Sequence, residues 1–321
     1  MRRGPTGFET PPGHLARLLE GMRELDDPAM PVLALHEFQP LLDSSDMVPA
    51  DWLRIARAIE EHYEDVDGFV VLHGTDTLAY TASALSFMLE GLGKPVILTG
   101  SQVPLAELRS DARENLVASA LLAARDDLHE VCVFFGGRLF RGNRVTKVSA
   151  SGFDAFDSPN EAPLAEVGVD IVIGPASPRA PDGSAVRVHD LADVSVAAVR
   201  LFPGIGASLL RAVLDRPVQG VVLETYGAGN APARDGALVG VIAEATARGV
   251  VVINCTQCLR GRVDMGGYAT GSALARAGVV SGADMTPEAA LTKLIWLLGK
   301  GLPPHRVTEL ASTNLRGELT A

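Results

Sequence analysis

Short apolar runs alternate along this chain with longer stretches whose apolar residues recur at helical spacing. In residues 50–65 the apolar positions lie three or four residues apart, which predicts a helix with one buried face. The continuous apolar run at residues 68–72 is typical of a parallel strand covered on both faces. A helix at 77–92 and a strand at 95–98 continue the pattern. Strands that alternate with helices of this length predict βαβ units with right-handed crossovers.

The alternation fails at residues 174–184, where three prolines and two glycines occur among eleven residues, and a second series begins near residue 194. A chain of 321 residues is also long enough for two domains of ordinary size. We therefore predict an α/β fold whose larger N-terminal domain has a mainly parallel sheet flanked by helices, with a smaller C-terminal α/β domain. The expected boundaries are 1–176 for the first domain, 177–193 for a linker and 194–321 for the second.

The charge balance excludes two classes of partner. The chain has 39 acidic against 28 basic residues, a formal charge of −11, whereas nucleic-acid binding needs a concentrated basic face and anionic membranes repel acidic proteins. No apolar run approaches the roughly 20 residues that span a bilayer. Three cysteines fit a reducing compartment, and the N-terminal arginines lack the apolar segment of a secretory signal. These features predict a cytoplasmic protein that binds neither nucleic acid nor membrane.

Several common cofactor and nucleophile motifs are incomplete. The Gly-x-Gly pieces at residues 204–206 and 227–229 lack the third glycine and the acidic residue of a dinucleotide site. Cys255 and Cys258 form a Cys-x-x-Cys without two further zinc ligands, so two buried cysteines at a strand end are the simpler interpretation. The seven histidines are scattered, and no Gly-x-Ser-x-Gly occurs. We therefore expect no metal and no cofactor.

The segment from His73 to Thr77, of sequence His-Gly-Thr-Asp-Thr, follows a predicted buried strand and precedes a helix. Ligands of open parallel sheets bind at the carboxyl ends of strands, and N–H groups at the start of a helix can hold an anion. Thr75 is therefore a candidate nucleophile or water activator, and Asp76 a candidate anchor for a substrate ammonium. In the structural alternative, Asp76 caps the helix.

A threonine hydroxyl is a weak nucleophile and needs a base, which a lysine can supply when burial and neighbouring charge lower its pKa. Lys147 is a candidate because it follows the predicted strand at 130–135 and the chain has only four lysines. The alternative is a solvated surface lysine. Residues 43–47, Asp-Ser-Ser-Asp-Met, are either a turn and cap cluster or a loop whose hydroxyls and N–H groups hold an amino-acid carboxylate.

Five segments resemble the asparaginase family, and within it the bacterial type I, cytoplasmic L-asparaginases. Residues 73–81 resemble the family's second signature, around its Thr-Asp pair, and the others are 43–47, 99–102, 141–147 and 266–271. The resemblance implies a two-domain amidohydrolase that converts L-asparagine to L-aspartate and ammonia through a threonine acyl-enzyme. It also implies a homodimer or homotetramer that uses neither cofactor nor metal.

Carried to the matching positions, the resemblance implies a triad of Thr75, Asp76 and Lys147, in which Asp76 also meets the α-ammonium of the substrate. The residues implied to bind the α-carboxyl end of the substrate are Asp43, Ser44 and Ser45. This agrees with the functional interpretation of the same three segments from their residue types.

Some type I enzymes also have a second, regulatory asparagine site in the C-terminal domain. Asn230, Thr256 and Cys258 fall in segments that resemble it. Glu224, however, stands where an arginine would contact the ligand, and a carboxylate there would repel the carboxylate of asparagine. We therefore expect this regulation to be absent or altered.

The sequence also departs from the family pattern. The family takes its acyl-enzyme nucleophile from a Thr-Gly-Gly-Thr turn after its first strand, and that turn does not occur here, while Phe8 replaces a tyrosine. We expect an in-frame strand and turn upstream of Met1, with the start codon assigned at an internal Met. One alternative is an inactive amino-acid-binding paralogue. Another is an amidotransferase subunit that supplies ammonia for tRNA-dependent glutamine synthesis, although that subunit carries an extra N-terminal domain.

Overall fold

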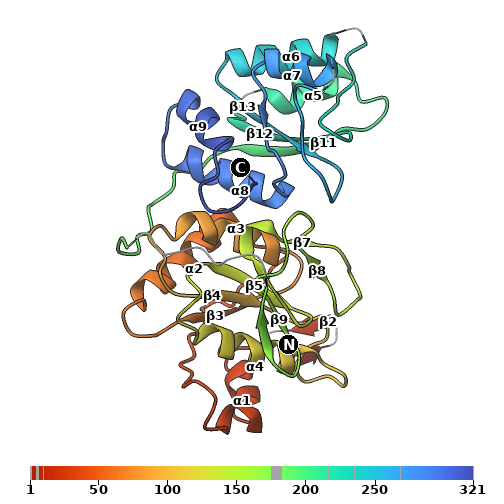
Figure 1. Ribbon diagram of the computed structural model, residues 1–321. Coiled ribbons are helices and arrows are strands. Elements are labelled where there is room, and N and C mark those ends of the chain that lie inside the picture. The colour runs from red at the N-terminus through yellow and green to blue at the C-terminus, as the bar shows by residue number, and fades with distance from the viewer. Residues whose placement is uncertain are drawn as a thin grey trace. The chain divides into compact units, whose positions relative to one another are not determined.

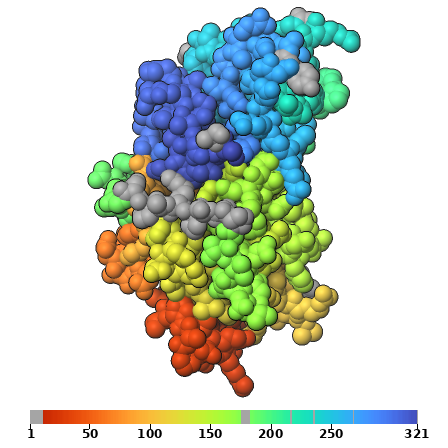
Figure 2. All heavy atoms as spheres, in the orientation of Figure 1, coloured from red at the N-terminus to blue at the C-terminus, as the bar shows by residue number. Residues whose placement is uncertain are grey.

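The computed structural model divides the chain into two compact units, Met1–Val188 and His189–Ala321 (Figure 1). In the space-filling view the first unit runs from red to green and the second from green to blue (Figure 2). The structure describes residues 2–4, 7–9, 11–174, 183–215, 217–234, 236–267 and 269–320. Residues 177–182 of the expected linker lie outside the described residues. None of the helices in these ranges is long and apolar enough to cross a membrane.

A six-stranded sheet forms the centre of the first unit. In sheet order its strands are β10 (Ile171–Ile173), β9 (Ala165–Val167), β6 (Arg138–Arg141), β5 (Val131–Phe135), β4 (Val96–Thr99) and β3 (Phe69–Leu72). The pairs β3–β4 and β4–β5 are parallel, as the alternation of strands and helices predicts. The other three pairs are antiparallel and extend the sheet beyond β5. The carboxyl ends of β3 and β4 therefore lie side by side at one edge of the sheet.

Helices cover both faces of this sheet (Figure 1). They are α2 (Pro49–Glu61), α3 (Leu78–Met88) and α4 (Ala112–Ala123). The helical spacing in α2 is confirmed, because Trp52, Ile55, Ala56 and Ile59 are buried. On the α4 face, large apolar side chains from the sheet and the helix form one cluster, including Ile97, Leu122, Phe134, Leu139 and Leu164.

The remaining elements of the first unit are short. They are the hairpin β1 (Arg2–Gly4) and β2 (Gly7–Glu9), the helix α1 (His14–Leu19), the 3₁₀ turns η1 (Arg23–Asp26) and η2 (Gly142–Arg144), and the pair β7 (Thr146–Lys147) and β8 (Phe156–Asp157). The antiparallel pairing of β7 with β8 fixes the backbone at Lys147, because this residue stands opposite Phe156, which is buried.

The second unit contains a four-stranded sheet in which every pair is parallel. Its strands, in order, are β11 (Val196–Arg200), β12 (Gly220–Thr225), β13 (Val251–Thr256) and β14 (Val280–Ser281). Its helices are α5 (Ala207–Leu214), α6 (Ala237–Ala247), α7 (Ala269–Arg276), α8 (Pro287–Gly299) and α9 (Pro304–Ala311). Leu210, Leu214, Val241 and Leu274 from the first three helices pack with Val221 of β12 in one core. Both units are thus α/β, as predicted.

Candidate active site

Three of the predicted site residues meet at the carboxyl end of β3. Thr75 and Asp76 lie in the turn between β3 and α3, and Lys147 ends β7. The Lys147 ammonium lies 2.9 Å from Thr75 Oγ1 and 2.8 Å from Asp76 Oδ1. One amine therefore bonds both a hydroxyl and a carboxylate that come from 71 or 72 positions away in the chain.

The exposed fractions of the two charged side chains indicate how much their ion pair can contribute to the stability of the fold. The Asp76 side chain is 70% exposed and that of Lys147 is 20% exposed. An ion pair this accessible contributes only about 0–1 kcal/mol to folding. The Asp76 cap predicted in the structural alternative is not observed, because Thr77 is the N-cap of α3 and that helix end has no side-chain cap. The arrangement thus leaves a hydroxyl, an amine and a carboxylate together at a surface that solutes can reach.

Glycines allow the turns around this contact to approach each other closely. A Cβ atom on Gly100, in the turn after β4, would lie 2.2 Å from the His73 carbonyl oxygen. A Cβ atom on Gly74 would lie 2.3 Å from Ser44 Oγ. Real Cβ atoms do not approach other atoms at such distances. Glycine is therefore needed at residue 100 for contact with the His73 backbone, and at residue 74 it leaves room for the Ser44 side chain. Segments 43–47, 73–77 and 99–102 are thereby packed into one site.

The segment at residues 43–47 closes on itself and on the Thr75 turn. Asp43 Oδ1 accepts hydrogen bonds from the Ser45 N–H at 3.0 Å and from the Ser45 hydroxyl at 2.7 Å. These bonds lower the pKa of Asp43, with burial opposing them, so the carboxylate stays ionised at neutral pH. Thr77 Oγ1 donates to the Ser44 carbonyl oxygen at 2.6 Å. The structure thus places Ser44 against the Thr75 turn, while Asp43 orients Ser45.

Gln102 is a site residue to which the sequence patterns assign no role. Its Oε1 atom accepts a hydrogen bond from Thr75 Oγ1 at 3.2 Å, and its Nε2 atom donates to the Gly152 carbonyl oxygen at 3.0 Å. Gln102 follows β4 in the same way that Thr75 follows β3, and these two strands are parallel neighbours. Because neighbouring parallel strands end at the same edge of a sheet, the sequence could have placed the turn after β4 at the site. A glutamine by itself, however, indicates no chemistry.

The His73 ring contacts both the turn that carries Thr75 and the helix α3 that follows it. Its Nδ1 atom lies 2.7 Å from the Gly74 carbonyl oxygen and its Nε2 atom 2.8 Å from Thr81 Oγ1. A carbonyl can only accept, so Nδ1 carries the proton and the Thr81 hydroxyl donates to Nε2. Burial lowers the pKa of His73, against the opposing effect of the bond to Gly74. The ring is therefore neutral at pH 7.

A neutral, half-buried histidine makes stability depend on pH. Because the pKa of His73 is lower in the folded protein than its unfolded value of about 6.5, the folded state binds fewer protons at mildly acid pH. This stabilisation is complete above pH ~6.5 and is lost as the pH falls through the folded pKa. We expect His73→Gln to flatten the dependence of unfolding free energy on pH between about 7.5 and 5, measured by urea denaturation.

The control for this prediction is His305→Gln, at an exposed position of α9. It should keep the slope of the parent protein. An equally steep slope in His73→Gln would show that another group causes the acid sensitivity.

The residues of the predicted regulatory site lie in the second unit. Thr256 Oγ1 donates to the Gly227 carbonyl oxygen at 2.6 Å and accepts from the Cys258 N–H at 3.0 Å. Asn230 Oδ1 accepts from Thr270 Oγ1 at 2.6 Å. Glu224 lies 3.4 Å from the Arg200 guanidinium of the neighbouring strand, so its carboxylate already has a cation beside it. Thr256 and Cys258 are thus bonded to each other, whereas the bond of Asn230 goes to α7. Cys255 is buried, but Cys258 is exposed, so the prediction of two buried cysteines is wrong for Cys258.

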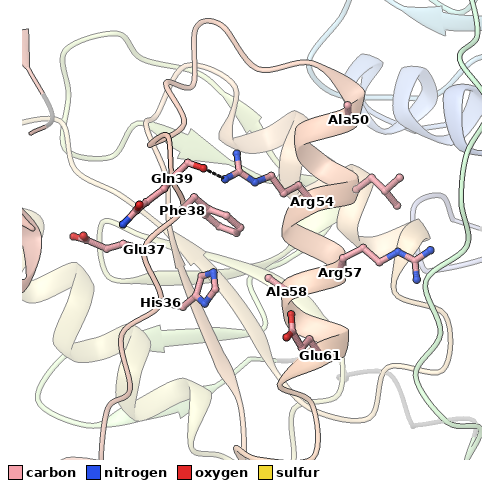
Figure 3. A pocket seen from close by; sticks show the side chains of 10 residues that line it. His36, Glu37, Phe38, Gln39, Ala50, Arg54, Arg57, Ala58 and Glu61 are labelled. Atoms are coloured by element: carbon pink, nitrogen blue, oxygen red, sulfur yellow. Dashed lines mark hydrogen bonds between the residues drawn. The ribbon is translucent and has the colours of Figure 1, made fainter. Parts of the chain in front are cut away.

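A groove of about 520 Å³ lies in the first unit between residues 36–39 and α2 (Figure 3). Arg54 stacks 5.0 Å from the centre of the Phe38 ring and donates to the Gln39 carbonyl oxygen at 2.8 Å. The residues predicted for the site do not line this groove. Within the described ranges, His, Cys, Asp and Glu side chains form no group of three or more that could hold a metal ion.

Both units of the chain match known proteins of one family. Residues 4–178 match the family model of the asparaginase N-terminal domain, and residues 195–310 match that of the glutaminase/asparaginase C-terminal domain. L-asparaginase 1 of Escherichia coli K12 is 53% identical over 321 residues, which cover 100% of this chain and 94% of that protein. A crystal structure of L-asparaginase I from Vibrio cholerae matches with a TM-score of 0.91 and 47% identity, over 99% of this chain and 97% of that one.

A more distant relative is named for a different role. One of the subunits of a glutamyl-tRNA(Gln) amidotransferase, from Pyrococcus horikoshii, is 39% identical over 287 residues. The match covers 86% of this chain and 65% of that protein.

Proposed function

The chain belongs to the asparaginase family, and from this membership we propose that it is an amidohydrolase that converts L-asparagine to L-aspartate and ammonia. The observation that carries the proposal is the contact of the Lys147 amine with both the Thr75 hydroxyl and the Asp76 carboxylate. Hydrolysis of a carboxamide through an acyl-enzyme needs a group that takes the proton of the attacking hydroxyl, and this contact supplies such a proton relay.

The roles of the site residues follow from their chemistry. In its neutral form Lys147 takes a proton from the Thr75 hydroxyl, which in turn takes one from the group that attacks the carboxamide. Asp76 holds the amine in place and, being largely exposed, can accept a hydrogen bond from the substrate α-ammonium. The hydroxyls and N–H groups of Ser44 and Ser45 bind the α-carboxylate. The attacking group is the hydroxyl of the threonine that the family takes from its Thr-Gly-Gly-Thr turn, which forms an ester with the carboxamide carbon as the C–N bond breaks. Lys147 returns the proton through Thr75 to the leaving nitrogen, so that ammonia departs. Water then hydrolyses the ester, which releases aspartate and restores the threonine hydroxyl.

In this proposal Thr75 is the second threonine of the reaction, which activates rather than attacks. The 321 residues contain no Thr-Gly-Gly-Thr turn. The test compares ammonia release from asparagine by the 321-residue chain and by a form extended upstream to any in-frame Thr-Gly-Gly-Thr. We expect the extended form to be active and the 321-residue chain to be nearly inactive. Strong activity of the shorter chain would instead make Thr75 itself the nucleophile.

The same assay separates the alternatives. An in-frame stop codon upstream, together with no ammonia release, would contradict the proposal and favour an amino-acid-binding paralogue. Ammonia release that requires a charged tRNA would favour the amidotransferase role for which the Pyrococcus relative is named. Hydrolysis of free asparagine without tRNA supports the amidohydrolase.

Three further features belong to the proposal. We infer that the enzyme acts in the cytoplasm, that it uses neither cofactor nor metal, and that it assembles as a homodimer or homotetramer. Light scattering after size-exclusion chromatography would give the oligomeric state directly. Activity that survives exhaustive chelation would support a metal-free reaction.

A further inference from the structure

We propose that Gln102 is a positioning residue that sets the direction of the Thr75 hydroxyl proton. This inference rests on the proposed function, because it concerns how Thr75 and Lys147 exchange a proton. Gln102 contacts Thr75 and not Lys147 in the bonds described above, so it acts on the amine through the hydroxyl.

The orientation of the Gln102 amide follows from its far partner. The Gly152 carbonyl oxygen, 3.0 Å from the side-chain nitrogen of Gln102, can only accept a hydrogen bond. The NH₂ group of Gln102 must therefore face Gly152, and the amide oxygen must face Thr75. Since an amide oxygen can only accept, the Thr75 hydroxyl has to donate its single proton toward Gln102.

This leaves the lone pairs of Thr75 Oγ1 for Lys147. The amine lies 2.9 Å away and donates to the hydroxyl oxygen. In this state the Thr75 proton points away from Lys147, and a rotation of the hydroxyl would bring it to the amine. Gln102 Oε1 and Lys147 Nζ are thus the two alternative partners of one proton. Gln102 thus sets the position of the hydroxyl before transfer, and its bond to Thr75 is given up when the proton turns to the amine.

The Gln102 backbone is held firmly enough for this role. Asp111, the residue before α4, accepts the N–H groups of Gln102 and Val103, each at 3.0 Å. The buried side chain of Asn115 donates to the Gly100 carbonyl oxygen at 2.9 Å. The turn is therefore fixed from α4, and the Gln102 side chain is fixed at both ends of its amide. A surface glutamine would have neither constraint.

Two substitutions test the role in the form of the protein that releases ammonia. Gln102→Met keeps the length of the side chain but removes its acceptor and its donor. We expect kcat to fall about tenfold, as for loss of one hydrogen bond, with KM within about twofold. Gln102→Glu can still accept from Thr75, but it places a negative charge near Lys147. The charged groups already at the turn are Asp76, beside Lys147, and Asp111, on the Gln102 backbone.

A direct readout comes from lysine NMR. The 321 residues contain four lysines, Lys94, Lys147, Lys293 and Lys300, so ¹³Cε-labelled lysine gives few signals to distinguish. Lys147→Arg identifies the Lys147 signal. In Gln102→Glu we expect its titration midpoint to rise by about one pH unit relative to the parent, because a nearby anion favours the charged amine. The acid limb of kcat/KM should move upward with it. The added charge acts on Lys147 whatever the native role of Gln102, so this shift tests whether the two side chains are close enough to be coupled. The positioning role itself is tested by the fall in kcat at nearly unchanged KM in Gln102→Met, which a purely structural role would not produce.

The matched control is Gln219→Met, at an exposed glutamine whose side-chain oxygen accepts the Ser195 N–H at 3.1 Å. It should leave kcat and the Lys147 signal unchanged. The inference is overturned if Gln102→Met keeps more than about half of the parent kcat, or if Gln102→Glu leaves the Lys147 titration in place. An inactive parent would contradict the proposed function instead, while the NMR comparison would still decide the coupling of Gln102 to Lys147.

Discussion

Lys147→Met should lower kcat/KM for asparagine by roughly 10²–10⁴-fold, the usual loss when a general base is removed. Methionine is unbranched and only one atom shorter than lysine, but it has no nitrogen to take a proton from Thr75 or to bond Asp76. The fold should survive, since the lost ion pair is largely solvent-exposed at its Asp76 end and contributes little stability. Ammonia release under saturating and subsaturating asparagine, together with the thermal unfolding midpoint, measures both effects.

Lys147→Arg distinguishes a base from a charge. Arginine can still pair with Asp76, but it stays protonated throughout the accessible pH range and accepts no proton. If Lys147 acts as a base, the arginine variant should be nearly as inactive as the methionine variant. Recovery of most activity in Lys147→Arg would show that only the positive charge is needed. Lys300→Met, at the end of α8, is the control and should keep full activity.

The helices and parallel strands could be predicted because their buried residues form recognisable sequence patterns, namely helical spacing or a continuous apolar run. The four buried residues of α2 recur at three- and four-residue spacing, and β3, β4 and β5 are continuous apolar runs. The antiparallel strands β9 and β10 have three residues each, too few to show a period, and Val172 is largely exposed. Their pairing depends on distant parts of the sheet, which local sequence does not encode.

The candidate site was predictable only in part, for a similar reason. Thr75 and Asp76 directly follow a buried strand, so sheet topology alone places them where ligands bind. Lys147 meets them across 72 positions of sequence, a distance that no spacing rule covers. Here its rarity as a lysine and the family resemblance supplied the signal. Gln102 lies in a segment that resembles the family, but neither its residue type nor the resemblance assigns it a role. That role depends on the orientation of its amide, which the Gly152 carbonyl group sets.

Lys293 is a charged side chain that is entirely buried, and no sequence pattern predicts this. It lies on α8 with no exposed surface, and its ammonium lies 2.6 Å from Glu318 Oε1, which is buried to the same extent. The amine also donates to the carbonyl oxygens of Ala311 at 3.1 Å and Thr313 at 2.6 Å. Glu318 in turn accepts the N–H groups of Leu315 and Arg316. One ion pair therefore anchors the C-terminal segment to α8.

Lys293→Met should lower the free energy of unfolding by about 3–5 kcal/mol, because it leaves the Glu318 carboxylate buried without its cation. Burial lowers the pKa of Lys293, and Glu318 only partly opposes it, so desolvation of the amine is a real cost of the native pair. The loss should therefore come mainly from the orphaned carboxylate and the two carbonyl oxygens, not from a strong intrinsic attraction. Urea denaturation at neutral pH measures the change.

Lys293→Met combined with Glu318→Gln tests this explanation of the loss. Removing the negative charge should recover part of the lost stability, while the N–H groups of Leu315 and Arg316 can still donate to the amide oxygen. Lys300→Met, which loses a contact over the Trp296 ring at 4.7 Å, should cost about 1 kcal/mol or less. If Lys293→Met costs no more than this control, the buried pair does not anchor the segment. If the double variant is no more stable than Lys293→Met alone, the orphaned charge is not the cause.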